Sequence, residues 1–305
     1  MPPILSCELC GIAMKNPLIL ASGILGVTKA SLRAAAHAGA GAVTIKSVSL
    51  EPRKGHDSPV VITCGDAMLN AVGYSNPGLE EARKEFAGLP EVGAPVIASI
   101  IGESAGDFAR MAEGLLGGGF AAVEVPLSCP HTPGYGMMGG QGTPEATYEI
   151  TEAVRKNSRI PVIVKLNAGV QAIGEVAKAA ERGGADAINV TNSIGPGMVI
   201  DVRARKPVLG FGAGGISGPA IRPLAVRAVY DVFKSVRIPV IGTGGVESGE
   251  DAAEMLMAGA SAVGIGWAVY KRGLEAFAGI SKELAAFMKE EGFASVKGMV
   301  GIAHD

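Results

Sequence analysis

The segment PVIGTGGVESGEDAAEMLMAGASAVGIGW, residues 239–267, decides the fold because it contains one complete strand–helix–strand unit. Its two ends, 239–244 and 262–267, are apolar without polar alternation, which is typical of strands buried on both faces. Between them, Ser248 can cap a helix with an acidic first turn, and Gly259 can end that helix. The segment therefore predicts two parallel strands joined by a helix.

The same unit recurs along the chain. The pattern (A/G)GA-x-A-(V/I), which joins a helix end to a strand, occurs at 38–43, 183–188 and 258–263. Further runs with the character of buried strands lie at 16–22, 42–48, 95–101, 121–127, 161–167 and 187–192. This rhythm favours a (β/α)8 TIM barrel over an open sheet.

The spacing of the strands also predicts the domain organisation. No linker divides the chain, so we expect a single domain over residues 1–305. Two connections are unusually long, at 50–78 after the second strand and at 194–223 after the sixth. Both would lie on the face where barrels hold their active sites.

Composition narrows the class of protein. The formal net charge is −2 and there is no long basic run, which argues against nucleic-acid binding. No secretory leader and no apolar run long enough for a membrane span are present, so we expect a cytoplasmic protein with free thiols. Cys7 and Cys10 supply only two of the four ligands of a tetrahedral metal site, so we expect a structural pair and no metal.

Two lysines lie inside apolar strands. Lys46 occurs in TIKSV and Lys165 in IVKLN, and a lysine buried there is costly unless it meets an anion or other acceptors. The alternative is that each side chain escapes to the barrel rim. Two such lysines on different strands favour an anionic cofactor or substrate.

Three features leave their function open at this point. The glycines of 242–252 are either a phosphate cradle or plain turn residues. Asn70 and Asn76 are either turn residues or amides that contact a planar polar ligand. Cys129, which directly follows the fourth strand, is either a base or nucleophile or a small buried residue.

In chain order, the segments NPLILASG, TIKSV, MLNAVGYSNPGLE, LSCPH, VKLN, TNSIG, GGISGPAIRPLAVRAVYDV and PVIGTGGVESGEDAAEMLMAGASAVGIGWAVY resemble the class 1 dihydroorotate dehydrogenases. The resemblance covers nearly the whole chain. It implies FMN at the carboxyl ends of the barrel strands and oxidation of dihydroorotate to orotate in pyrimidine synthesis. The loops look most similar to class 1B, which implies an iron–sulfur, FAD-containing partner subunit, NAD as acceptor and a homodimer core. Class 1A would use fumarate instead.

The resemblance also implies roles for individual residues. Cys129 matches the base that removes the C5 proton while hydride passes from C6 to flavin N5. Lys46 matches a lysine between flavin and substrate, and Lys165 one near the flavin pyrimidine edge, where its charge would stabilise reduced anionic flavin. FMN contacts are implied at Ala21, Ser22, Gly23, Lys46, Ser47, Ser99, Lys165, Thr191, Gly218, Gly244, Gly245, Gly266 and Trp267. Substrate contacts are implied at Lys46, Asn70, Ala71, Val72, Gly73, Tyr74, His131, Asn192 and Ser193.

Several positions depart from the family pattern. Pro126 and His131 replace asparagines around the cysteine, Ser99 also stands where asparagine is usual, and Tyr74 and Trp267 replace leucine and threonine. The sequence Ser-Cys-Pro-His also resembles the FMN domain of dihydropyrimidine dehydrogenases. The alternative interpretation is therefore an FMN oxidoreductase of this family that acts on another dihydropyrimidine of the uracil or thymine type, or on a related ring.

Overall fold

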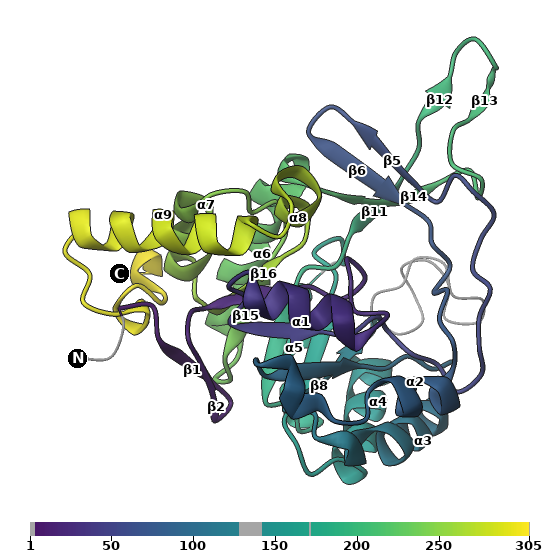
Figure 1. Cartoon of the computed structure of the whole chain (residues 1–305), viewed down its shortest axis with the longest axis horizontal. Coiled ribbons are helices and arrows are strands. Elements are labelled where there is room, and N and C mark those ends of the chain that lie inside the picture. Colours follow the sequence, from purple (N-terminus) through teal and green to yellow (C-terminus); the bar gives the residue numbers. More distant parts are fainter. Residues whose placement is uncertain (1–3, 128–141, 171, 305) are drawn as a thin grey trace.

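The structure is a computed structural model that describes residues 4–127, 142–170 and 172–304. Its centre is a closed barrel of parallel strands, each hydrogen-bonded to the next one in chain order, with the last closing on the first. All eight predicted strands are present, which confirms the (β/α)8 barrel (Figure 1). They are β3 (Leu18–Leu20), β4 (Ala42–Thr44), β7 (Val96–Ser99), β8 (Ala122–Pro126), β9 (Val162–Leu166), β10 (Ala187–Val190), β15 (Val240–Thr243) and β16 (Ala260–Ile265).

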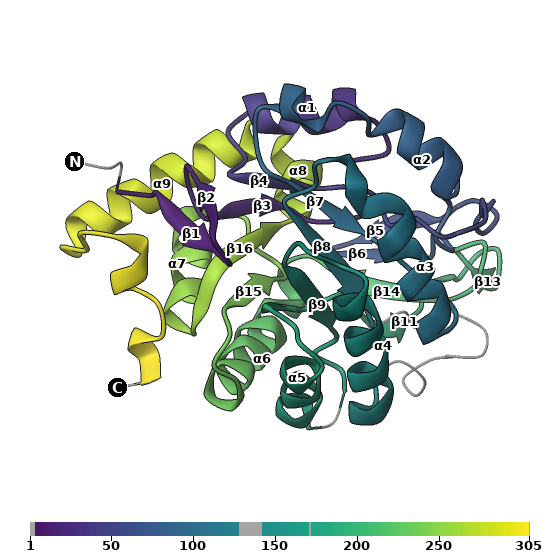
Figure 2. The same ribbon diagram turned by 90° about the horizontal axis from the view of Figure 1, so that it is seen from below.

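Helices surround the barrel, as Figure 2 shows. The helix predicted after residue 248 begins with a capping box, in which the Ser248 hydroxyl accepts from the Asp251 amide and the Asp251 carboxylate accepts from the Ser248 amide. It ends just before Gly259, as expected. The α-helices are α1 (Lys29–His37), α2 (Leu79–Glu85), α3 (Ala105–Leu115), α4 (Pro144–Lys156), α5 (Ile173–Arg182), α6 (Arg222–Ser235), α7 (Gly249–Met257), α8 (Trp267–Arg272) and α9 (Ala276–Glu290). Within the described ranges, none of these helices has both the length and the apolar character of a membrane span.

The barrel interior near the amino-terminal ends of the strands is filled by one residue from each strand. These residues, here called the floor layer, alternate between isoleucine and alanine around the barrel, so that large and small side chains interlock. The floor layer consists of Ile19, Ala42, Ile97, Ala122, Ile163, Ala187, Ile241 and Ala262, and all are buried.

An N-terminal hairpin covers the floor layer from outside. Strands β1 (Cys7–Leu9) and β2 (Ile12–Met14) pair antiparallel, and Leu9 and Met14 belong to the same apolar cluster as the floor layer. The hairpin therefore plugs the amino-terminal end of the barrel, a role that sequence reasoning did not predict.

The two nearby thiols share this environment. Cys7 lies in β1, and Cys10 lies in the turn after it, where its Sγ donates to the Asp186 carbonyl at 3.2 Å. Burial raises the pKa of Cys7 to about 11, and burial together with the charge of Asp186 raises the pKa of Cys10 to about 12. Both thiols are therefore protonated and unreactive at neutral pH. Among the described residues, no group of three His, Cys, Asp or Glu side chains could hold a metal ion.

The two predicted insertions follow the second and sixth barrel strands, as expected, and they form one sheet together. The first contains β5 (Val61–Cys64) and β6 (Ala67–Asn70), and the second contains β11 (Ile194–Gly197), β12 (Ile200–Asp201), β13 (Lys206–Pro207) and β14 (Gly214–Ser217). The antiparallel order is β11–β14–β6–β5, and the β12–β13 hairpin projects beyond it (Figure 1). This joint sheet was not predicted.

Candidate active site

The barrel interior changes from apolar to polar one level above the floor layer. Because side chains alternate along a strand, the residue two positions beyond each floor residue faces the same interior. These residues, here called the upper layer, are Ala21, Thr44, Ser99, Glu124, Lys165, Asn189, Thr243 and Gly264. A Cβ on Gly264 would lie 2.0 Å from Thr243 Oγ1, so glycine leaves room for that hydroxyl. The polar groups lie toward the carboxyl ends of the strands, where barrels hold their active sites.

Glu124 is the centre of a hydrogen-bond network in the upper layer. Its Oε1 accepts from Ser22 Oγ at 2.8 Å, and its Oε2 accepts from Asn189 Nδ2 at 2.6 Å. Asn189 Oδ1 in turn accepts from Thr243 Oγ1 at 2.8 Å. Sequence reasoning missed Glu124, Asn189 and Thr243 as site residues. The signal was present, because a glutamate interrupts the apolar run of β8 just as Lys165 interrupts that of β9.

Lys165 lies inside the barrel and not at its rim. Its side chain is 5% exposed, and Nζ is 3.8 Å from Glu124 Oε1. The interpretation that this lysine escapes to the rim is therefore wrong. Lys46 is half-buried at the end of β4, and a Cβ built on Gly23 would lie 3.8 Å from its Nζ. The segment after β3 is thus adjacent to Lys46.

Ser99 of the upper layer forms a buried pair with Ser47. Their hydroxyl oxygens are 2.8 Å apart, and Ser99 is fully buried. Position 99 has asparagine in the family pattern. Here the Ser99 and Ser47 hydroxyls are within hydrogen-bond distance of each other. Both residues are predicted FMN contacts.

Two glycines of the predicted FMN site, Gly218 after β14 and Gly245 after β15, lie close together. Gly245 has a φ of +75°, and a Cβ there would lie 2.8 Å from the Gly218 carbonyl oxygen. Gly218 has a φ of +94°, and a Cβ there would meet the Trp267 ring at 3.0 Å. The indole Nε1 of Trp267 donates to Glu247 Oε1, which ties the loop after β15 to the start of α8. Close backbone packing of this kind is how glycine-rich loops present amide groups to a phosphate.

Gly244 and Gly266 lie in the same region. A Cβ on Gly244 would meet Ala225 Cβ at 2.8 Å and Thr191 Cγ2 at 3.3 Å, and one on Gly266 would lie 3.9 Å from Ala21 Cβ. The strand ends therefore bring together the predicted cofactor residues from four separate parts of the chain.

Predicted substrate residues on the first insertion and just before the second meet at the joint sheet. Asn70 Nδ2 donates to the Gly215 carbonyl at 3.2 Å, and a Cβ on Gly215 would lie only 2.2 Å from Ser193 Oγ. Ser193 is fixed from the barrel side, because Asn167 Nδ2 donates to its carbonyl at 3.0 Å and its own amide donates to Asn192 Oδ1 at 2.9 Å. Asn70, Asn192 and Ser193 thus form one cluster.

The Thr191 hydroxyl connects two backbone segments. Its Oγ1 accepts from the Ala168 amide at 2.7 Å and donates to the Asn192 carbonyl at 2.9 Å. Asn76 is similar, because its side chain joins Ser49, Tyr74 and Gly78 and is 7% exposed. The structure therefore supports the interpretation of Asn76 as a turn residue over that of an amide that contacts a ligand.

The loop of Ala71, Val72, Gly73 and Tyr74 is held by His56, which sequence reasoning did not single out. The His56 amide donates to the Val72 carbonyl at 3.1 Å, and His56 Nδ1 is 3.1 Å from the Ala71 carbonyl. The imidazole also stacks on Phe211 of the second insertion, with ring centroids 4.0 Å apart. Tyr74 has a φ of +56°, a left-handed conformation that is uncommon for a residue with a side chain.

Two predicted site residues, Cys129 and His131, lie outside the described residues. The last described residue before them is Leu127, whose amide donates to the Lys165 carbonyl at 3.0 Å. The chain therefore leaves β8 directly beside Lys165. On the alternation described above, Pro126 faces the barrel interior one level above Glu124.

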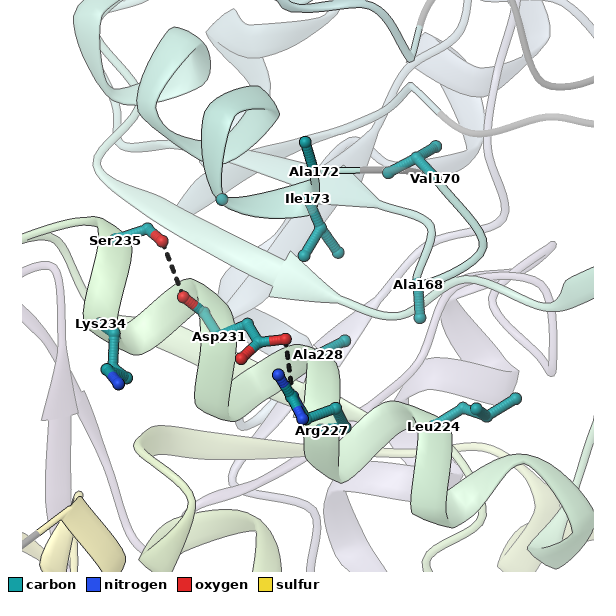
Figure 3. A pocket seen from close by; sticks show the side chains of 11 residues that line it. Ala168, Val170, Ala172, Ile173, Leu224, Arg227, Ala228, Asp231, Lys234 and Ser235 are labelled. Carbon is teal, nitrogen blue, oxygen red and sulfur yellow. Dashed lines mark hydrogen bonds and ion pairs between the residues drawn. The ribbon is translucent and has the colours of Figure 1, made fainter.

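A separate pocket of about 460 Å³ opens between α5 and α6 on the outside of the barrel (Figure 3). None of the predicted site residues lines it. Within it, Arg227 Nε donates to Asp231 Oδ2 at 2.8 Å, so that these opposite charges are paired. The pocket is distinct from the barrel mouth.

Comparison with known proteins agrees with this geometry. The sequence model of the family described as "Dihydroorotate dehydrogenase" matches residues 4–288. A protein of Pyrococcus abyssi is 46% identical over 98% of this chain and 99% of its own length. One of Methanothermobacter thermautotrophicus is 44% identical over 99% of both chains, and one of Methanosarcina mazei is 46% identical over 97% of this chain and 94% of its own. All three are named "Dihydroorotate dehydrogenase B (NAD(+)), catalytic subunit". With a full-length match and the barrel that the family motifs imply, the chain belongs to the dihydroorotate dehydrogenase family.

Proposed function

We propose that this chain oxidises dihydroorotate to orotate with bound FMN, as the catalytic subunit of a class 1B enzyme. The observation that carries the proposal is the full-length similarity to proteins whose names state this reaction class and this role. Pro126 and His131 are the residues that favour the alternative substrate, another dihydropyrimidine or a related ring. The names of the relatives favour dihydroorotate.

The residues at the barrel mouth fit an FMN molecule. The Gly218 carbonyl lies so close to Gly245 that a Cβ on Gly245 would clash with it, which suits a backbone cradle for phosphate. Lys46 and Lys165 supply positive charge at the ends of β4 and β9. When bound, FMN supplies a two-electron acceptor for the hydride. We also assign FMN contacts to the other predicted positions from Ala21 to Trp267.

Different residues of the chain would then have different roles in the reaction. Lys165 holds a positive charge in a buried site, where it favours the negative charge that develops on reduction. Asn70, Asn192 and Ser193, with the loop of residues 71–74, orient the substrate ring. Cys129 would take the C5 proton of dihydroorotate, with FMN, once bound, supplying the acceptor for the C6 hydride. His131, from the same segment, would contact the substrate.

The partner and compartment are part of the same proposal. NAD appears in the names of the relatives, which are all catalytic subunits, so we propose an iron–sulfur, FAD-containing subunit that carries electrons to NAD. We further propose a homodimer core and a cytoplasmic location. Sedimentation equilibrium of the purified chain tests the dimer, and NAD reduction that appears only when the second subunit is added tests the electron path.

The proposal is tested by titrating the FMN-loaded protein with pyrimidines. Orotate should perturb the flavin spectrum at lower concentration than uracil or thymine, and dihydroorotate should bleach it. A protein that takes up no FMN contradicts the cofactor assignment, and a response to uracil without one to orotate favours the alternative substrate.

The proposed base is tested by Cys129→Ser. Because a serine hydroxyl is a far weaker base near neutral pH, we expect flavin bleaching by dihydroorotate to slow by at least 100-fold, within the usual range for a general base. Cys64→Ser is the matched control, since Cys64 is exposed on β5, and it should leave the rate unchanged. An unchanged rate in Cys129→Ser at neutral pH would remove the proton-transfer role from this residue.

A further inference from the structure

Glu124 is a buried carboxylate that the mechanism above does not use. It lies in the upper layer, is 3% exposed, and has a contact on each oxygen. Ser22 Oγ donates to Oε1 at 2.8 Å and Asn189 Nδ2 donates to Oε2 at 2.6 Å. Lys165 Nζ lies 3.8 Å from the same Oε1 that Ser22 occupies. Ser22 and Lys165 therefore share one oxygen of the carboxylate.

The carboxylate is held from several strands at once. Glu124 is on β8, Lys165 on β9 and Asn189 on β10, and Asn189 is fixed in turn by Thr243 at the end of β15. Ser22 follows β3 on the other side of the barrel. Because each partner belongs to a different barrel segment, the position of the carboxylate is determined by the closed sheet and not by one flexible loop.

Stability alone does not explain a glutamate at this place. Removing a carboxylate from water costs several kcal/mol, and replacing a buried ion pair by apolar residues of similar volume is often neutral or stabilising. The floor layer directly below shows that this barrel packs well with isoleucine and alanine alone. The effect specific to Glu124 is a negative charge beside Lys165, in surroundings where charges interact strongly.

We propose that Glu124 acts through Lys165: its carboxylate offsets part of the positive charge of the Lys165 ammonium and thereby lowers the reduction potential of the bound flavin. The proposal rests on the FMN function proposed above. Lys165 favours the reduced anionic flavin, and a carboxylate 3.8 Å from its Nζ weakens that preference. The Ser22 hydroxyl, which donates to the same oxygen, limits this weakening.

Two substitutions should shift the flavin potential in opposite directions. Glu124→Gln removes the negative charge at nearly constant volume, so the potential should rise. We expect at least a tenfold gain in the preference for reduced over oxidised FMN, equivalent to about 30 mV for a two-electron couple. Ser22→Ala leaves Oε1 to Lys165 alone, so the potential should fall. The matched control is Glu149→Gln, an exposed carboxylate on α4, which should not shift it.

The measurement is a spectroelectrochemical titration of the FMN-loaded proteins, with the FMN dissociation constant as a second readout. An unchanged or lower potential in Glu124→Gln overturns the proposal. If Glu124→Gln does not fold, Ser22→Ala decides, and an unchanged or higher potential there overturns it equally. A wild-type protein that binds no FMN would contradict the proposed function instead, so the two failures are distinguishable.

Discussion

A methyl group added at Gly215 tests how the two insertions build the substrate cluster. In Gly215→Ala, the new Cβ would lie 2.2 Å from Ser193 Oγ and 2.8 Å from Ser193 Cβ, whereas ordinary contact begins at 3.4 Å. Rotating the hydroxyl does not relieve the clash with Cβ. Even with the hydroxyl rotated away, Ser193 has to retreat by about 0.6 Å, the difference between 3.4 Å and the 2.8 Å contact at its Cβ. It is held from the other side by Asn167.

The size of the effect follows from the packing. Overpacking a well-filled site costs about 1–3 kcal/mol. If that strain is released when Ser193 leaves its binding position, orotate affinity should fall by roughly 5- to 150-fold, since each 1.4 kcal/mol is tenfold. The assay is orotate titration of the flavin spectrum, with urea unfolding to find how much of the cost appears as lost stability.

Two further variants test whether the clash with Ser193 causes the loss of orotate affinity. Gly106→Ala lies on the exposed side of α3, where the nearest atom to a new Cβ is 3.7 Å away, and it should be neutral or stabilising. Ser193→Gly combined with Gly215→Ala removes the clashing side chain, so the double variant should be less impaired than the sum of the single changes. Unchanged orotate affinity and unchanged stability in Gly215→Ala would refute the reasoning.

Three other predictions concern the amino-terminal end of the barrel. Ile163→Ala should lower the free energy of unfolding by about 2–5 kcal/mol because it opens a cavity in the floor layer. The control Ile200→Ala changes a half-exposed residue on β12 and should cost under about 0.5 kcal/mol. Equal costs of the two changes in urea unfolding would contradict the close packing of the floor layer. At pH 8, peptide mapping after iodoacetamide should show fast alkylation of exposed Cys64 and slow alkylation of Cys7 and Cys10. The folded state keeps the last two thiols protonated, so stability should fall as pH rises from about 9 toward 11, and less so in a Cys7→Ala/Cys10→Ala variant.

Much of the barrel could be predicted from the sequence because the signals are local. Strands buried on both faces have unbroken Val and Ile runs, and helix ends have Ser248 and Gly259. Lys165 was identified for the same reason, as one charge in an apolar run. Cys129 and His131 remain predictions from motif resemblance.

Other features depend on contacts that no local pattern contains. Strands β6 and β14 pair although Asn70 and Gly215, which they bring together, are 145 residues apart. The strands of the β1–β2 hairpin are too short for their sequence pattern to predict that the hairpin closes the end of the barrel. The partners of Glu124 come from strands whose relative level is set only when the sheet closes.

The sequence by itself determined the strand and helix order, the closed parallel barrel and the family, because hydrophobic periodicity and motifs are properties of neighbouring residues. Only the tertiary structure decided which polar side chains share a level inside the barrel. That level depends on the register between strands and on the stagger of the closed sheet. Register placed Ser22, Glu124, Lys165 and Asn189 in one network, directly above a floor of isoleucine and alanine.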